Sequence, residues 1–146
     1  MKITLGTASY DDYAGIWGMV QALRLYQSPV HEIIVVDNNP TGPHAALTKD
    51  FCNKAECRYI PFNMVTGTSA PRDLVFREAT GDFVFCMDAH IHLWPGAIAK
   101  LNAWLETHQD TQDLLAGPFV YDGLTTFNTQ FNDEWRGQMW GTWGNA

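Results

Sequence analysis

The chain has 146 residues, a formal net charge of −7 and only nine Lys and Arg residues. A chain of this length forms one domain and buries enough surface to fold without disulfides. The acidic balance argues against a nucleic-acid partner and against an anionic membrane surface, because both need a basic patch. The three cysteines show no paired spacing, no run reaches membrane-spanning length and no signal peptide is recognisable, so a cytoplasmic location is expected.

Strands and helices are predicted to alternate along most of the chain. Apolar runs predict strands within residues 2–10, 31–40, 57–62, 82–90 and 113–122. Apolar residues at helical spacing predict helices within residues 13–27, 44–55, 67–81 and 95–108. Asp11 or Asp12 is expected to cap the first helix, and Ser28-Pro29 to end it.

The alternation predicts a three-layer α/β/α domain with an open, mostly parallel, Rossmann-like sheet. Ligands bind such sheets beyond the carboxyl ends of the strands. Polar clusters lie at three of those predicted ends, within residues 7–10, 37–39 and 88–92. The pattern therefore predicts one polar ligand site at this edge of the sheet.

The stretch FVFCMDAHIHLWPG places Asp88, His90 and His92 directly after an apolar run. On an extended backbone these alternating side chains point the same way. A carboxylate and an imidazole suit Mn²⁺ or Zn²⁺ as metal ligands. Two other interpretations stay open: Asp88 caps the following segment, or His90 and His92 form the metal pair of an amidohydrolase-type metallohydrolase, although this chain is too short for that enzyme's barrel.

Asp37 and Arg72 are two further candidates. Asp37 ends the second predicted strand, where a carboxylate binds a ribose hydroxyl or a base edge, or simply stabilises a turn. Arg72 opens the helix before the apolar run and suits a phosphate, Asp88 or plain solvent as its partner. The glycine motifs of dinucleotide-binding and P-loop enzymes are absent from the sequence, which disfavours both classes.

From Lys2 to about Leu105 the sequence resembles the family 2 glycosyltransferases of GT-A fold. ITLGTASYDDYAGIWGMVQAL and EIIVVDNNP are similar to the opening strands and helix of that family. GTSAPRDLVFREATGDFVFCMDAH is similar to the block that leads from a glycine to the Asp-x-Asp metal motif. Here the motif is Asp88-Ala89-His90, a form typical of the polypeptide N-acetylgalactosaminyltransferases.

The resemblance implies a nucleotide-diphospho-sugar transferase that uses a UDP-sugar, Mn²⁺ or Mg²⁺, and a glycan, protein or small-molecule acceptor. It implies that Asp37 contacts the nucleoside and that Asp88 and His90 hold the metal. The expected nucleotide-binding residues are Thr7, Ala8, Ser9, Tyr10, Asp37, Asn38, Asn39, Gly67, Arg72, Asp88 and Ala89.

Residues 1–146 are expected to form a single GT-A domain. Within it, residues 1–105 form the nucleotide-sugar-binding part and residues 106–146 a partial acceptor-side region. Because family members are usually longer, a truncated carboxyl-terminal part is expected. A nucleotide-sugar-binding module or pseudoenzyme without catalysis is therefore the second candidate function.

The tail FNDEWRGQMWGTWGNA supplies the remaining candidates. Asp133 and Glu134 are carboxylates that can act as a general base. Trp135, Trp140 and Trp143 can form a platform for a sugar ring. The plainer interpretation is that this tail only covers the sheet.

Overall fold

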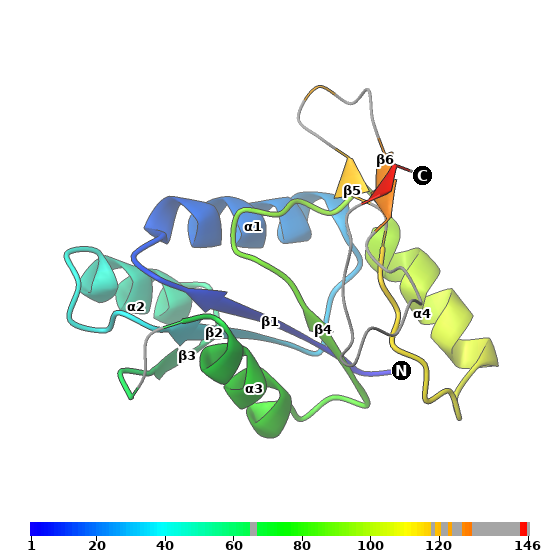
Figure 1. Ribbon diagram of the computed structural model, residues 1–146, viewed down its shortest axis with the longest axis horizontal. Helices are drawn as coiled ribbons and strands as arrows, with labels where there is room; N and C mark the ends of the chain where they lie inside the picture. Colours follow the sequence, from blue (N-terminus) through cyan, green and yellow to red (C-terminus); the bar gives the residue numbers. More distant parts are fainter. Residues whose placement is uncertain (65–66, 118, 121–122, 124–126, 130–143, 146) are drawn as a thin grey trace. The chain divides into compact units, whose positions relative to one another are not determined.

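The structure is a computed structural model that describes residues 1–64, 67–117, 119–120, 123, 127–129 and 144–145. Its backbone contacts divide the chain into two compact units, Met1–Gln109 and Asp110–Ala146. The first unit alternates strands with helices (Figure 1). Its strands are β1 (Ile3–Ser9), β2 (Glu32–Asp37), β3 (Arg58–Pro61) and β4 (Phe83–Cys86), and its helices are α1 (Tyr13–Tyr26), α2 (Ala45–Lys54), α3 (Ser69–Glu78) and α4 (Ala97–Thr107).

The four strands of this unit form one parallel sheet in the order β3-β2-β1-β4. The central strand β1 pairs with both β2 and β4, so that Leu5 lies beside Ile33 and Phe85. Every residue of β1 except Ala8 is buried, and β2 has a continuous apolar run from Ile33 to Val36, because helices cover both faces of the sheet.

Helices α1, α2 and α4 cover one face of the sheet. Leu5 and Val35 of the strands pack with Ile16 and Met19 of α1 and with buried residues of α2. The α4 residues Ile98 and Leu105 pack in a second cluster on Ile3. All of these side chains are buried, and their clusters form the larger part of the core.

Helix α3 covers the opposite face, where Val75 packs against Ile34 and Val36 (Figure 1). Gly6 of β1 lies directly under this helix, since an added Cβ atom would come within 2.0 Å of Val75 Cγ1. The close approach of α3 therefore depends on a residue without a side chain. These layers confirm the predicted α/β/α fold with a parallel sheet.

The helix boundaries agree with their sequence signals. Asp12 caps α1 by accepting a hydrogen bond from Gly15 N at 2.9 Å. The helix ends at Tyr26, two residues before Ser28. Among the residues that the structure describes, no helix is long and apolar enough to cross a membrane.

In the described part of the chain, the predicted fifth strand at residues 113–122 is not part of the parallel sheet. Among its described residues, Phe119–Val120 forms a strand, β5, which pairs antiparallel with β6 (Phe127–Thr129); β6 in turn pairs with β7 (Gly144–Asn145). The apolar residues Leu114 and Leu115 are exposed instead of buried. The sequence also carries Pro118 in this run, and proline cannot donate to a strand ladder.

Candidate functional site

The carboxyl ends of β1, β2 and β4 meet at one edge of the sheet. Ser9 pairs with Asp37, and Asn38 N donates to Ser9 O at 2.8 Å. On the other side of β1, Cys86 pairs with Gly6 and Met87 N donates to Gly6 O at 3.0 Å. The structure therefore brings the predicted segments 7–10 and 37–39 and the start of the predicted segment 88–92 to the same edge.

Asp37 is held rigidly at the end of β2. Asp37 is only 3% exposed, and both of its carboxylate oxygens accept hydrogen bonds. Oδ1 accepts from Asn39 N at 2.9 Å and Oδ2 from the Tyr59 hydroxyl at 2.6 Å. Burial, together with the hydrogen bond to Asp37, raises the pKa of Tyr59 above its usual range, so this hydroxyl keeps the proton that it donates.

The residues around Asp37 differ in how far they reach solvent. Thr7 is fully buried and Ser9 nearly so, whereas Tyr10 is 63% exposed. Asn38 Nδ2 donates to Gly67 O at 2.9 Å, and its Oδ1 is buried without a hydrogen-bond partner in the described part of the chain. Gly67 adopts a φ of +117°, which favours glycine at this position.

Asp88 pairs with Arg72 across the end of the sheet. Arg72 lies in the first turn of α3, and its Nη2 donates to Asp88 Oδ1. Both side chains are 40% exposed, so this ion pair remains open to a ligand. Of the three partners that the sequence suggested for Arg72 (a phosphate, Asp88 or solvent), the structure shows Asp88.

The backbone turns directly after Asp88. Strand β4 ends at Cys86, and Ile91 N donates to Asp88 O at 3.1 Å, which closes a turn at Ala89 and His90. The strand predicted within residues 82–90 therefore ends before Asp88, and the extended backbone on which Asp88, His90 and His92 would point the same way is not present. Ala89 is buried in the core beneath this turn.

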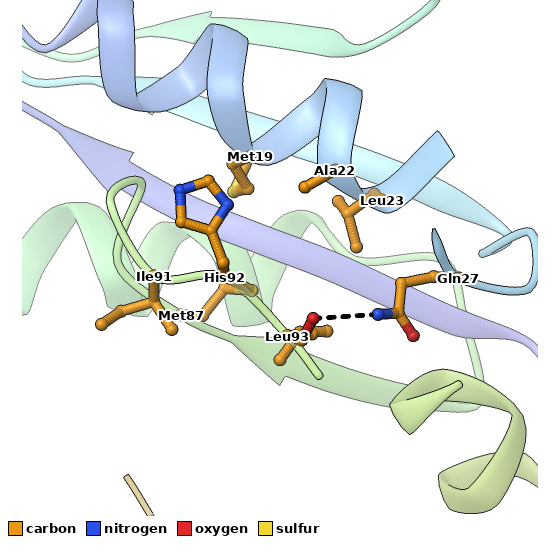
Figure 2. A pocket seen from close by; sticks show the side chains of 8 residues that line it. All are labelled: Met19, Ala22, Leu23, Gln27, Met87, Ile91, His92 and Leu93. Carbon is orange, nitrogen blue, oxygen red and sulfur yellow. Dashed lines mark hydrogen bonds between the residues drawn. The ribbon is translucent and has the colours of Figure 1, made fainter. Parts of the chain in front are cut away.

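The two histidines face different groups. His90 Nδ1 lies 3.8 Å from Asp12 Oδ2, at the start of α1. His92 lies against α1 itself, where its Cε1 is 3.5 Å from the position of a Cβ atom on Gly18. Figure 2 shows His92 beside a small and mostly apolar pocket between α1 and residues 87–93. The pocket is lined by Met19, Ala22, Leu23, Gln27, Met87, Ile91, His92 and Leu93.

The donor set at this edge fits a divalent cation that shares its coordination with a ligand. In the described part of the chain, no three His, Cys, Asp or Glu side chains form a group that can hold a metal. Asp88 and His90 nevertheless offer a carboxylate and an imidazole on side chains that are 40% and 69% exposed. Mn²⁺ accepts such donors, with water or phosphate oxygens in the remaining positions.

Sequence reasoning missed Tyr59 entirely and saw Asp12 only as a cap. Tyr59 pairs with Val35, and Asp37 follows Val35 on the same face of β2, so the ring of Tyr59 lies diagonally below the carboxylate. The alternation of side chains along β2 and β3 is consistent with this contact, but the contact can be predicted only when the register of the two strands is known. Asp133, Glu134 and the three tail tryptophans lie outside the described residues.

A sequence model described as "Glycosyl transferase family 2" matches residues 5–142. No curated protein sequence matches the chain significantly. Among solved structures, S. aureus TarS 1–349 in complex with UDP-GlcNAc has a TM-score of 0.64 and 20% identity, over 75% of this chain and 32% of TarS. The mannosyltransferase PcManGT from Pyrobaculum calidifontis, in complex with GDP-Man and Mn²⁺, has a TM-score of 0.58 and 20% identity, over 80% of this chain and 34% of that one.

The chain spans about a third of the length of these solved structures. At this identity the likeness shows a shared fold, which is a GT-A-like arrangement of helices around a parallel sheet. The family match is independent of that likeness and runs through nearly the whole chain. The chain therefore belongs to the family 2 glycosyltransferases.

Proposed function

We propose that this domain transfers a sugar from a nucleotide-diphosphate sugar, with a UDP-sugar as the expected donor, in a metal-dependent reaction. The acceptor would be a glycan, a protein or a small molecule. One observation carries the proposal: the ends of β1, β2 and β4 bring Asp37 and Asp88 to the same edge of the sheet. Membership of the glycosyltransferase family supports the reaction class.

Asp37 is the proposed contact for the nucleoside. Tyr59 and Asn39 N each occupy one of its oxygens, and a carboxylate oxygen can accept a second hydrogen bond. A ribose hydroxyl or a base N–H is a suitable donor to this second position. Because the two internal bonds fix the carboxylate before the ligand arrives, little side-chain entropy is lost on binding.

Asp88 and His90 are the proposed ligands of Mn²⁺ or Mg²⁺. A bound divalent cation neutralises the developing charge on a diphosphate leaving group as a Lewis acid. Arg72 holds the Asp88 carboxylate by its hydrogen bond, and its half-exposed guanidinium can also bind phosphate oxygens. These three side chains would therefore orient the diphosphate end of the donor.

A binding module without catalysis is the second candidate. Every described site residue belongs to the donor side, whereas the proposed bases Asp133 and Glu134 lie outside the described residues. No observation favours the metallohydrolase, since His90 and His92 lie against different parts of α1. The binding module and the transferase share the nucleotide site and differ only in turnover.

Thermal unfolding with nucleotide and metal tests the proposal. UDP with Mn²⁺ should stabilise the chain by about 2.7 kcal/mol at a ligand concentration 100 times Kd, and UDP alone should not. Asp88→Asn should abolish this metal-dependent shift, because it removes the charged oxygen donor. His92→Ala is the matched control and should keep the shift; its loss would instead favour the hydrolase.

An unchanged melting temperature with Mn²⁺ and each of several nucleotides would contradict the transferase and the binding module together. A full response to UDP and Mn²⁺ in Asp88→Asn would show that the metal site is misplaced. Release or transfer of the sugar from a UDP-sugar then distinguishes the enzyme from the binding module.

A further inference from the structure

The carboxylate of Asp12 connects the start of α1 with the turn that follows β4. Its Oδ1 accepts a hydrogen bond from Gly15 N at 2.9 Å, and its Oδ2 lies 3.8 Å from His90 Nδ1. One oxygen therefore serves the helix, and the other faces the imidazole. The exposed fraction of the Asp12 side chain is 37%, so it is partly enclosed between the two segments.

The local sequence fixes this carboxylate in place. A Cβ atom on Gly15 would lie 2.3 Å from Asp12 Oδ2 and 2.7 Å from its Cγ, so only glycine at position 15 leaves room for it. The partial positive charge at the amino terminus of α1 further favours a negative group there. Asp12 is thus held by its own helix, independently of His90.

We propose that Asp12 is a positioning residue for the metal site, which turns the His90 imidazole so that Nε2 is presented to the cation. This inference rests on the proposed metal-dependent function. In metal sites, a ligating histidine commonly directs its other ring nitrogen to a carboxylate, which fixes both tautomer and orientation. Here Nδ1 is the nitrogen that faces Asp12, which leaves Nε2 for the metal.

The distance of 3.8 Å between Asp12 Oδ2 and His90 Nδ1 is longer than a hydrogen bond, so the two groups face each other in this structure without being hydrogen-bonded. A cation held at Nε2 would draw electron density from the ring and make Nδ1–H a stronger hydrogen-bond donor. The attraction to Asp12 then increases and favours the metal-bound orientation. Asp12 therefore acts on the cation only through His90.

Asp11 provides a matched control for charge. It is the neighbouring carboxylate, but its Oδ1 contacts His44 Nδ1 at 3.1 Å and not His90. Its φ of 56° lies in the left-handed region, which asparagine tolerates. Asp11→Asn and Asp12→Asn thus remove the same charge from adjacent positions, and only the second removes a partner of His90.

The test measures the Mn²⁺ affinity of the full chain at a fixed UDP concentration, from the electron paramagnetic resonance signal of free Mn²⁺. Asp12→Asn should weaken Mn²⁺ binding about tenfold, the lower end of the effect of such supporting partners. Asp11→Asn should stay within about twofold of the wild type. Without Mn²⁺, Asp12→Asn should have the same melting temperature as the wild type, because asparagine caps a helix as well as aspartate does.

A double-mutant cycle completes the test, since two residues that act as one unit are not additive. His90→Ala should weaken Mn²⁺ binding, and adding Asp12→Asn to it should cause no further loss. Unchanged Mn²⁺ affinity in Asp12→Asn, an equal loss in Asp11→Asn, or a full further loss in the His90→Ala background would each overturn the role of Asp12. A wild-type chain that takes up no Mn²⁺ with UDP would refute the metal-dependent function and this role with it.

Discussion

Gln27, which directly follows α1, holds the segment beyond the candidate site through hydrogen bonds of its side-chain amide. Its Nε2 donates to Leu93 O at 3.2 Å (Figure 2) and to Trp94 O at 2.9 Å. Its Oε1 accepts from Ile98 N at 3.1 Å. The amide thereby joins α1, the segment after the turn at Ala89 and His90, and the start of α4. Gln27→Leu keeps the size of the side chain and removes all three hydrogen bonds.

The expected loss follows from those bonds. Each neutral hydrogen bond contributes about 1 kcal/mol net, and water can partly replace the exposed bond to Trp94. The sum for Gln27→Leu is therefore about 2 kcal/mol in the free energy of unfolding. For a domain of this size that loss lowers the melting temperature by roughly 6 °C.

Urea unfolding followed by circular dichroism measures this loss directly. Gln109→Leu is the matched control, because Gln109 is exposed and its amide bonds only to Glu106 O within the same stretch of chain. The control should change the free energy of unfolding by less than about 0.5 kcal/mol. A Gln27→Leu variant as stable as this control would refute the assignment of Gln27 as the fastening residue.

The same unfolding assay checks two further expectations. Gly6→Ala places a Cβ atom 2.0 Å from Val75 Cγ1 and should cost about 1–3 kcal/mol. Gly117→Ala, which meets nothing within 4 Å in the part of the chain that the structure describes, should cost little; equal stability of the two variants would contradict the packing of α3. Tyr59→Phe leaves the buried Asp37 carboxylate with one hydrogen bond fewer and should cost about 2 kcal/mol. The pKa of Tyr59 is raised in the folded chain, so the stability that its hydroxyl contributes is complete below the unfolded pKa of about 10 and is lost as the pH rises above that value. At alkaline pH the stability of the wild type should therefore fall more steeply than that of Tyr59→Phe. Parallel pH profiles of the two proteins would contradict this.

The four parallel strands and their helices could be predicted because each is encoded locally. The run IIVV within EIIVVD is continuously apolar, as expected of a strand that is covered on both faces, and EIIVVD forms β2. The apolar spacing of YAGIWGMVQAL similarly predicts α1, whose buried residues are Ile16, Met19, Val20 and Leu23. The prediction of a fifth strand in the parallel sheet was wrong because Gly117-Pro118 interrupts its apolar run.

The partners within the candidate site could not be predicted in the same way. Tyr59 is separated from Asp37 by 22 positions and Arg72 from Asp88 by 16, and each contact depends on how two elements are placed in space. His90 faces Asp12 because β4 ends at Cys86. The apolar pattern of the sequence places the end of a strand only to within a few residues, so it did not predict this. The residue types therefore indicated which side chains can bind a ligand, whereas their contact partners became known only from the fold.

The pairing at this edge also explains why the proposed reaction calls for a divalent cation. Arg72 already neutralises Asp88, and His44 lies against Asp11, while the buried Asp37 accepts only neutral donors. Arg72 can turn fully to a diphosphate only if it leaves Asp88, which then becomes an unpaired carboxylate beside an anion. A divalent cation at Asp88 would remove this conflict, because it would take the place of Arg72 at the carboxylate and add positive charge for the diphosphate. The charged side chains that the structure describes at this edge thus support the proposed metal dependence.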